Sequence, residues 1–140
     1  MQDSETQLIE SEIEKYDEYD DFFDENKKLL KEVHPGTYIE KLLCEKKLKK
    51  AQVVSKLNIN KGYAYEILRQ EKHPDRDKVL QFAIAMELSI LETQNMLNRC
   101  GYACLYGKNL RDTVIYFCII KQKSIIDTNL LLYNHGFELL

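Results

Sequence analysis

Tryptophan is absent from the 140-residue chain, and only two prolines and five glycines interrupt it. A sandwich of short strands needs frequent turns, which glycine and proline supply, so their scarcity argues against an all-β fold. No window shows the alternation of apolar and polar residues that marks a half-buried strand. We therefore expect an all-α protein.

Long apolar runs and paired cysteine motifs are missing as well. The longest apolar run, Val114 to Ile120, is far shorter than the roughly 20 residues needed to cross a bilayer. The acidic start has neither the basic nor the apolar region of a signal peptide. The four cysteines form no CxxC pair, and we interpret them as reduced, mostly buried apolar side chains: Cys44, Cys100, Cys104 and Cys118. These observations predict a cytoplasmic protein without a membrane segment.

Motifs of enzymes and cofactor sites are also lacking. The sequence contains no glycine-rich phosphate loop, no nucleophile elbow and no HExxH motif. His34, His73 and His135 are scattered beside predicted turns or helix ends, and no cysteine spacing with a nearby histidine suits zinc. We expect no enzymatic activity, no metal and no cofactor.

Charge is distributed unevenly along the chain, although the formal net charge is only −3. Residues 1–33 hold 12 acidic and four basic residues, whereas residues 34–140 hold 11 acidic and 16 basic residues. The segment 46–78 alone holds ten basic and four acidic residues. An acidic arm, residues 1–36, therefore precedes a basic segment of the kind that attracts phosphate.

The acidic arm carries apolar side chains at helical spacing. Its stripe predicts one or two helices over residues 4–33 and consists of Leu8, Ile9, Ile13, Tyr16, Tyr19, Phe22, Phe23, Leu29, Leu30 and Val33. The tripeptide His34-Pro35-Gly36 ends the arm, because proline disfavours helix at the residue before it. Two roles stay open: a docked structural helix, or a segment that shields the basic face or binds a partner protein.

The last third of the chain is an internal duplication. Residues 76–105 align without a gap on residues 111–140, with 11 of 30 positions identical. Ser89 and Ser124 are predicted N-caps, and Gly101 and Gly136 suit the left-handed position that follows a helix. Each copy is thus a predicted helical hairpin, with helices near 76–87, 89–100, 108–121 and 124–135. The helix dipole explains the Asp but not the Arg of the Arg-Asp pair that begins each copy.

The C-terminal hairpin, residues 106–140, is unusually apolar. Its apolar side chains exceed what one face can bury within the molecule, and they are Val114, Ile115, Phe117, Ile119, Ile120, Ile125, Ile126, Leu130, Leu131 and Leu132. We expect this hairpin to extend the core and to supply or buttress a dimer contact, so that its deletion causes aggregation or monomerisation.

A regular set of apolar positions, a turn and a proline runs through residues 48–88. Helical periodicity predicts helices at 37–47, capped by Thr37, at 50–57 and at 61–69, the last capped by Asn60. The set comprises Leu48, Val53, Val54, Leu57, the turn Asn58-Ile59-Asn60, Ile67, Pro74, Val79, Leu80, Ala83 and Leu88. In this spacing the segment resembles the helix-turn-helix of the λ-repressor/Cro-like (XRE) family of small bacterial and phage regulators. The resemblance implies a helix-turn-helix domain over residues 37–105, with extra helices at both ends.

The same resemblance places the helix 61–69 in the major groove of DNA. The candidate DNA-binding residues are then Lys49, Lys50, Gln52, Lys61, Gly62, Tyr63, Tyr65, Glu66, Arg69 and Lys72. Lys49 and Lys50 are expected to contact phosphate, while Lys61, Tyr63 and Glu66 set the base preference. Tyr63 and Tyr65 are expected to flank one face, a pattern that is equally typical of a protein interface.

Two functional interpretations follow from this sequence. The first is a DNA-binding transcriptional regulator that binds double-stranded DNA as a homodimer, because one small helix-turn-helix seldom supplies enough specificity. The alternative is a protein-interaction adaptor or regulatory subunit built on a helix-turn-helix scaffold. Salt distinguishes them, because only DNA binding weakens by orders of magnitude between roughly 50 and 200 mM salt.

Overall fold

A computed structural model describes residues 4–30 and 32–140, and helices are the only regular secondary structure in those ranges. The prediction of an all-α protein is therefore confirmed. The helices are α1 (Ser4–Ile13), α2 (Tyr19–Leu30), α3 (Pro35–Glu45), α4 (Lys50–Ser55), α5 (Lys61–Leu68), α6 (Arg76–Ala85), α7 (Ile90–Arg99), α8 (Leu110–Ile120) and α9 (Ile125–Asn134). Contacts divide the chain into two compact units, residues 1–32 and residues 33–140.

The first unit is a pair of helices, α1 and α2, with a small aromatic cluster formed by the start of α2 and the turn before it. Phe22 is buried, and its ring lies 5.9 Å from that of Tyr16 and 6.1 Å from that of Tyr19. Tyr19 also stacks on Phe23 at 6.1 Å. The predicted helices with an aromatic stripe are confirmed here. The predicted apolar contacts of Leu8, Leu29 and Leu30 fall on side chains outside the described part of the chain.

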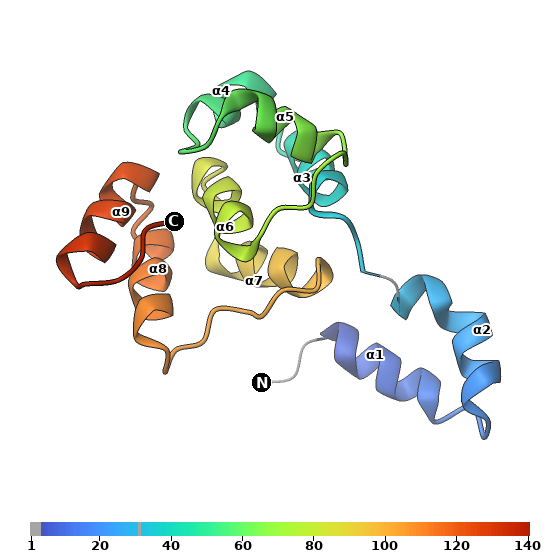
Figure 1. Ribbon diagram of the computed structural model, residues 1–140. Coiled ribbons are helices and arrows are strands. Elements are labelled where there is room, and N and C mark those ends of the chain that lie inside the picture. Colours follow the sequence, from blue (N-terminus) through green and yellow to red (C-terminus); the bar gives the residue numbers. More distant parts are fainter. Residues whose placement is uncertain (1–3, 31) are drawn as a thin grey trace. The chain divides into compact units, whose positions relative to one another are not determined.

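Helix α6 forms the centre of the second unit. All seven residues from Val79 to Ala85 are buried, which is expected of a helix that is apolar on every side. Helices α4, α7 and α9 pack against it. Figure 1 shows α6 between α3–α5 on one side and the α8–α9 hairpin on the other.

Most helix boundaries lie within two residues of their predicted positions, because local caps set them. The side chain of Asn60 accepts from the Tyr63 N–H at 3.3 Å. The hydroxyls of Ser89 and Ser124 each accept from the N–H three residues on, at 3.1 Å, and at Ser89 a full capping box forms. Gly101 and Gly136 directly follow the C-caps of α7 and α9, with φ of 83° and 76°. The predicted caps at Asn60, Ser89 and Ser124 and the predicted left-handed glycines are confirmed.

The start of α3 differs from its prediction. The helix begins at Pro35, and its N-cap is His34, whose Nδ1 accepts from the Gly36 N–H at 3.0 Å. Thr37 is therefore not the cap, because proline at the first helical position already has the backbone angle that a helix needs. Pro35 and Gly36 are buried parts of α3, not a connecting turn.

Cysteine burial is another point of difference. Cys100 and Cys118 are buried, but Cys44 and Cys104 are exposed, and none of the four forms a disulfide. The expectation of mostly buried cysteines is therefore wrong for half of them. Periodicity does not resolve such cases, because a small side chain at a helix edge suits either environment.

The two copies of the duplication pack on one another reciprocally. Helix α6 of the first copy contacts α9, and α7 contacts α8. Arg76 forms a bidentate pair with Asp112, with both N···O distances 2.9 Å. Arg111 forms the corresponding pair with Asp77 at 3.0 and 2.9 Å. The arginine of each copy thus binds the aspartate of the other, as residues do across the two-fold axis of a symmetric dimer.

Each of these arginines also holds the tail of its own copy. The guanidinium donates to two backbone carbonyls, which for Arg76 are those of Ala103 and Cys104, and for Arg111 those of Glu138 and Leu139. The Arg-Asp pair that begins each copy is therefore a clamp between the copies, which accounts for the arginine that helix capping leaves unexplained.

Candidate nucleic-acid interface

Helices α4 and α5 are joined by a turn, residues 56–60, that the core holds in place. The backbone N–H of Asn58 donates to Oε1 of Gln81 at 2.8 Å, and Gln81 lies in α6 with only 1% of its surface exposed. Val53 and Val54 on α4 are buried, as are Ala64 and Ile67 on α5. The outer ends of both helices are therefore presented from a fixed base.

Sequence reasoning missed Gln81. The one signal is a polar residue inside a helix that is otherwise apolar throughout, since its neighbours Val79, Leu80, Phe82 and Ala83 are all buried. A buried amide needs a hydrogen-bond partner, and the turn supplies it. The partner could not be named from the sequence, because it lies 23 residues away.

The outward residues of α5 are only partly those predicted. Lys61 and Gly62 are exposed, and Glu66 is half-buried one turn further along. Tyr63 and Tyr65 are half-buried and pack against the core, and the Lys78 Nζ lies 5.8 Å from the centre of the Tyr63 ring. Because residues two apart on a helix point in different directions, the two tyrosines lie on different sides of α5.

Half of the basic residues in the segment 46–78 already have a carboxylate partner. Lys50, predicted to contact phosphate, pairs with Glu40 of α3 at 2.5 Å. Arg69 makes two bonds to Glu71, at 3.0 and 3.1 Å. The other ion pairs are Lys46–Glu92, Arg76–Asp112 and Lys78–Asp75. These five side chains contribute less positive potential than the sequence count implies.

The remaining five lysines lie outside these ion pairs, although Lys72 is near enough to Glu71 to help lower the pKa of that carboxyl. Within the described part of the chain no ion pair is recorded for Lys47, Lys49, Lys56, Lys61 and Lys72, and all five are exposed. They lie at the ends of α3, α4 and α5, while the predicted contact residue Gln52 is exposed on α4. The free cations of the segment are thus gathered around the α4–α5 pair.

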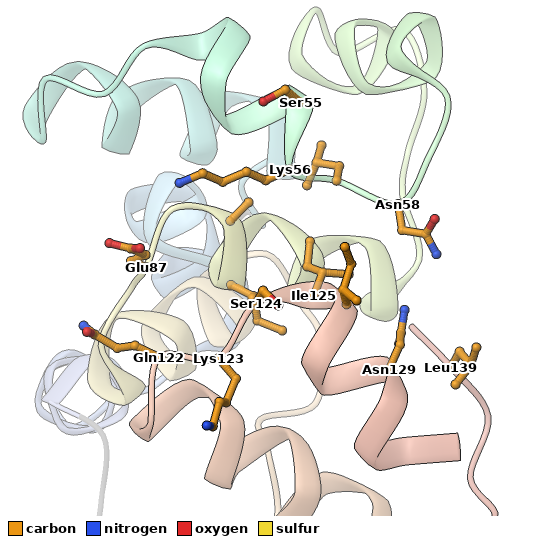
Figure 2. Close-up of a pocket in the computed structure, with 14 residues that line it drawn as sticks. Ser55, Lys56, Asn58, Glu87, Gln122, Lys123, Ser124, Ile125, Asn129 and Leu139 are labelled. Atoms are coloured by element: carbon orange, nitrogen blue, oxygen red, sulfur yellow. The ribbon is translucent and has the colours of Figure 1, made fainter. Parts of the chain in front are cut away.

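A cleft of about 630 Å³ lies beside the turn between α4 and α5. Leu57, Ile84 and Ile125 contribute to an apolar lining. Figure 2 shows Lys56 and Asn58 along one side and residues of the α8–α9 turn and α9 along the other. The cleft therefore separates the α8–α9 hairpin from the turn between α4 and α5.

The described residues hold no group of three or more His, Cys, Asp or Glu side chains that could bind a metal ion. No helix among them is long and apolar enough to span a bilayer.

Comparison with known protein families, curated proteins and solved structures finds no match for this chain. Evidence for its function therefore comes from its own residues and their geometry.

Proposed function

We propose that this protein is a cytoplasmic DNA-binding transcriptional regulator, in which α4, the turn and α5 form a λ-repressor-like helix-turn-helix. One observation carries the proposal. A short helix pair, held to the core through Gln81, is surrounded by exposed lysines that form no ion pair among the described residues. Free cations around a rigid, outward-facing helix are what phosphate contact and base reading require.

In this account α5 enters the major groove with its N-terminal end toward the bases. Lys61 is an exposed donor suited to guanine, and Glu66 accepts from the amino group of cytosine. Lys49 and Lys72 contact phosphate, as do Lys47 and Lys56. Lys50 has a smaller role than the sequence predicts, since its ammonium group is already held by Glu40.

The regulator acts as a homodimer on a two-fold DNA site. A single α5 contacts only a few base pairs. Two α5 helices, placed about 34 Å apart to match one helical turn of DNA, contact twice as many. Non-enzymatic binding is the whole of the proposed activity.

A protein-interaction adaptor is the second candidate. The observation that favours it is the pairing of Lys50 with Glu40 and of Arg69 with Glu71, which removes two predicted DNA contacts. An adaptor would bind its partner with little dependence on salt.

Selection of bound sequences from random double-stranded DNA tests the proposal. The full chain should enrich one two-fold motif. Lys61→Ala and Glu66→Ala should each relax preference at single base pairs, by about 1–3 kcal/mol. Lys108→Ala, an exposed lysine outside the α4–α5 region, is the matched control and should leave the motif unchanged. A library that emerges unenriched contradicts DNA binding and favours the adaptor.

A further inference from the structure

The outer side of the α8–α9 hairpin exposes a row of large apolar side chains. Phe117 and Ile120 on α8 are 49% and 55% exposed, and Ile126, Leu130 and Tyr133 on α9 are 81%, 57% and 72% exposed. Phe117 and Leu130 line one shallow groove between the two helices. Ile126 and Tyr133 lie one turn to either side of Leu130. These five residues form one continuous surface, the hairpin face.

The first copy of the duplication shows how such a surface is used in this molecule. The counterparts of Phe117 and Ile120 are Phe82 and Ala85, which are 0% and 4% exposed. Both lie on α6, against which α4, α7 and α9 pack. In the first copy the α8 part of this face is therefore covered, whereas the counterparts of its α9 part, Leu91, Asn95 and Asn98, are exposed as they are in the second copy.

We propose that the hairpin face binds the same face of a second copy of this chain, forming a two-fold symmetric homodimer. The inference rests on the proposed function, for which two α5 helices related by a two-fold axis are needed. It adds the surface that joins them. An interface of this kind is self-complementary, so no other protein is required to cover the apolar row.

The size of the hairpin face suits a dimer. If each of the five side chains has a total surface of ~200 Å², their exposed fractions give an exposed apolar area of roughly 600 Å² per copy. This area is close to the ~800 Å² that each partner buries in a standard interface. Leu110, exposed and seven residues before Phe117, extends the same side of α8. Monomeric proteins rarely expose apolar patches beyond about 300–600 Å².

The charges around the hairpin face also suit a second copy. Lys121 and Lys123 lie at one end, and Asp127 lies with them at the start of α9. Lys121 covers part of Phe117, with Nζ 5.9 Å from the ring centre. The rim thus lacks the dense single-sign charge that DNA or a strongly charged partner would need. A two-fold axis lets the lysines of each copy approach the aspartate of the other.

Sedimentation equilibrium of the full chain tests this interface. The wild type should have twice the 16.5 kDa chain mass at micromolar concentration. Ile126→Asp and Leu130→Asp should each weaken association at least 100-fold while circular dichroism stays helical. Leu91→Asp is the matched control, because Leu91 is the counterpart of Ile126 in the first copy and is 64% exposed on α7. Its dimer should be unchanged.

Two results would overturn the proposal. One is a wild-type chain that stays monomeric up to about 100 μM, because the hairpin face then binds no second copy. The other is a dimer that survives both aspartate substitutions. The proposed function is judged separately by DNA binding of the same samples. If the wild type is a dimer that Leu130→Asp dissociates, but it binds no DNA, the proposed interface stands and the proposed DNA-binding function is contradicted. If the wild type binds DNA but is a monomer, the interface is contradicted and DNA binding stands.

Discussion

Among single residues, Gly36 shows most directly how closely two helices of the second unit pack. It lies in α3 where this helix crosses α5, and an added Cβ would be 2.1 Å from the carbonyl oxygen of Ile67. The obstacle is backbone of the neighbouring helix, which cannot rotate away as a side chain does. Only glycine allows α3 and α5 to approach this closely.

Gly36→Ala should therefore destabilise the protein. The expected loss is about 2–3 kcal/mol in the free energy of unfolding, measured by urea denaturation, because α3 must separate from α5. DNA affinity should fall as well, since α5 is displaced. Gly107→Ala is the control, because its added Cβ meets nothing within 4 Å. Equal stability of the two variants would contradict the close packing of α3 on α5.

His34 links the stability of α3 to pH. Its Nδ1 must be unprotonated to accept from the Gly36 N–H. Burial, together with the nearby His73, lowers the pKa of His34 below its ordinary value of 6.5. The unfolded chain therefore binds a proton more readily than the folded one. Stability from this site is complete above pH 6.5 and is lost as pH falls through the lower folded pKa.

His34→Asn should remove this pH dependence. Asparagine is a good N-cap, so the acceptor is kept while the titrating group is lost. Thermal melts of the wild type should show decreasing stability as pH is lowered from about 7 past 6.5, whereas the variant should show a shallower decrease. His135→Asn, at the exposed end of α9, is the control and should retain the wild-type slope. A wild-type slope in His34→Asn would show that another group titrates.

At the scale of elements, the two arginine clamps have the same design but different burial. The Asp112 side chain is 9% exposed, whereas that of Asp77 is 31% exposed. Burial alone would raise the pKa of Asp112, but hydrogen bonds from Arg76 and from the Tyr106 N–H outweigh it and lower the pKa. The ionised carboxylate of Asp112 thus depends on its arginine more than that of Asp77 does.

Arg76→Met and Arg111→Met should consequently differ in cost. The first leaves a nearly buried carboxylate without its cation and should cost about 3 kcal/mol of unfolding free energy. The second leaves a carboxylate that water can reach and should cost about 1 kcal/mol. Each variant also loses two carbonyl bonds, so these cancel in the comparison. If denaturant titrations show the same loss of unfolding free energy for Arg76→Met and Arg111→Met, burial of the aspartate does not set the cost.

Helices and their caps could be predicted from the sequence because the causes are local. Asn60, Ser89 and Gly101 act on residues within one turn of themselves, and all three behave as predicted. The start of α3 was missed because the cap is a histidine, a residue type that the capping preference does not favour.

The candidate site was harder to predict, since its decisive contacts are long-range. Lys50 pairs with Glu40 across two helices, and the turn is held by Gln81 from a third. Arg76 finds its partner 36 residues away. Charge counting along the chain shows that the segment is basic, but only the packed structure shows which lysines remain available.

For the whole molecule, the uneven charge raises the question of the acidic arm. The first unit forms its own aromatic contacts around Phe22, consistent with a structural helix pair. We therefore expect a chain without residues 1–32 to bind DNA with unchanged affinity at low salt. Gel-shift titration checks this. Tighter binding by the shortened chain, with a gain that shrinks as salt rises, would instead indicate that the arm shields the basic face.

The central claim is that free lysines around α4 and α5 bind DNA phosphate. Salt dependence measures this directly, because each phosphate contact releases counterions and adds about 0.9 to the slope of log affinity against log salt. Lys49 and Lys56, both proposed to contact phosphate, form no ion pair among the described residues, whereas Lys50 is held by Glu40. The account thus distinguishes lysines that lie close together in the sequence.

The decisive measurement is the affinity of the full chain for its selected duplex between about 50 and 200 mM salt. The affinity of the wild type should fall by orders of magnitude, and Lys49→Ala and Lys56→Ala, which remove proposed phosphate contacts, should each lower the slope by about one. Lys50→Ala should change the slope less than either. Binding that is absent, or that is insensitive to salt in the wild type, would contradict the claim that this surface binds DNA.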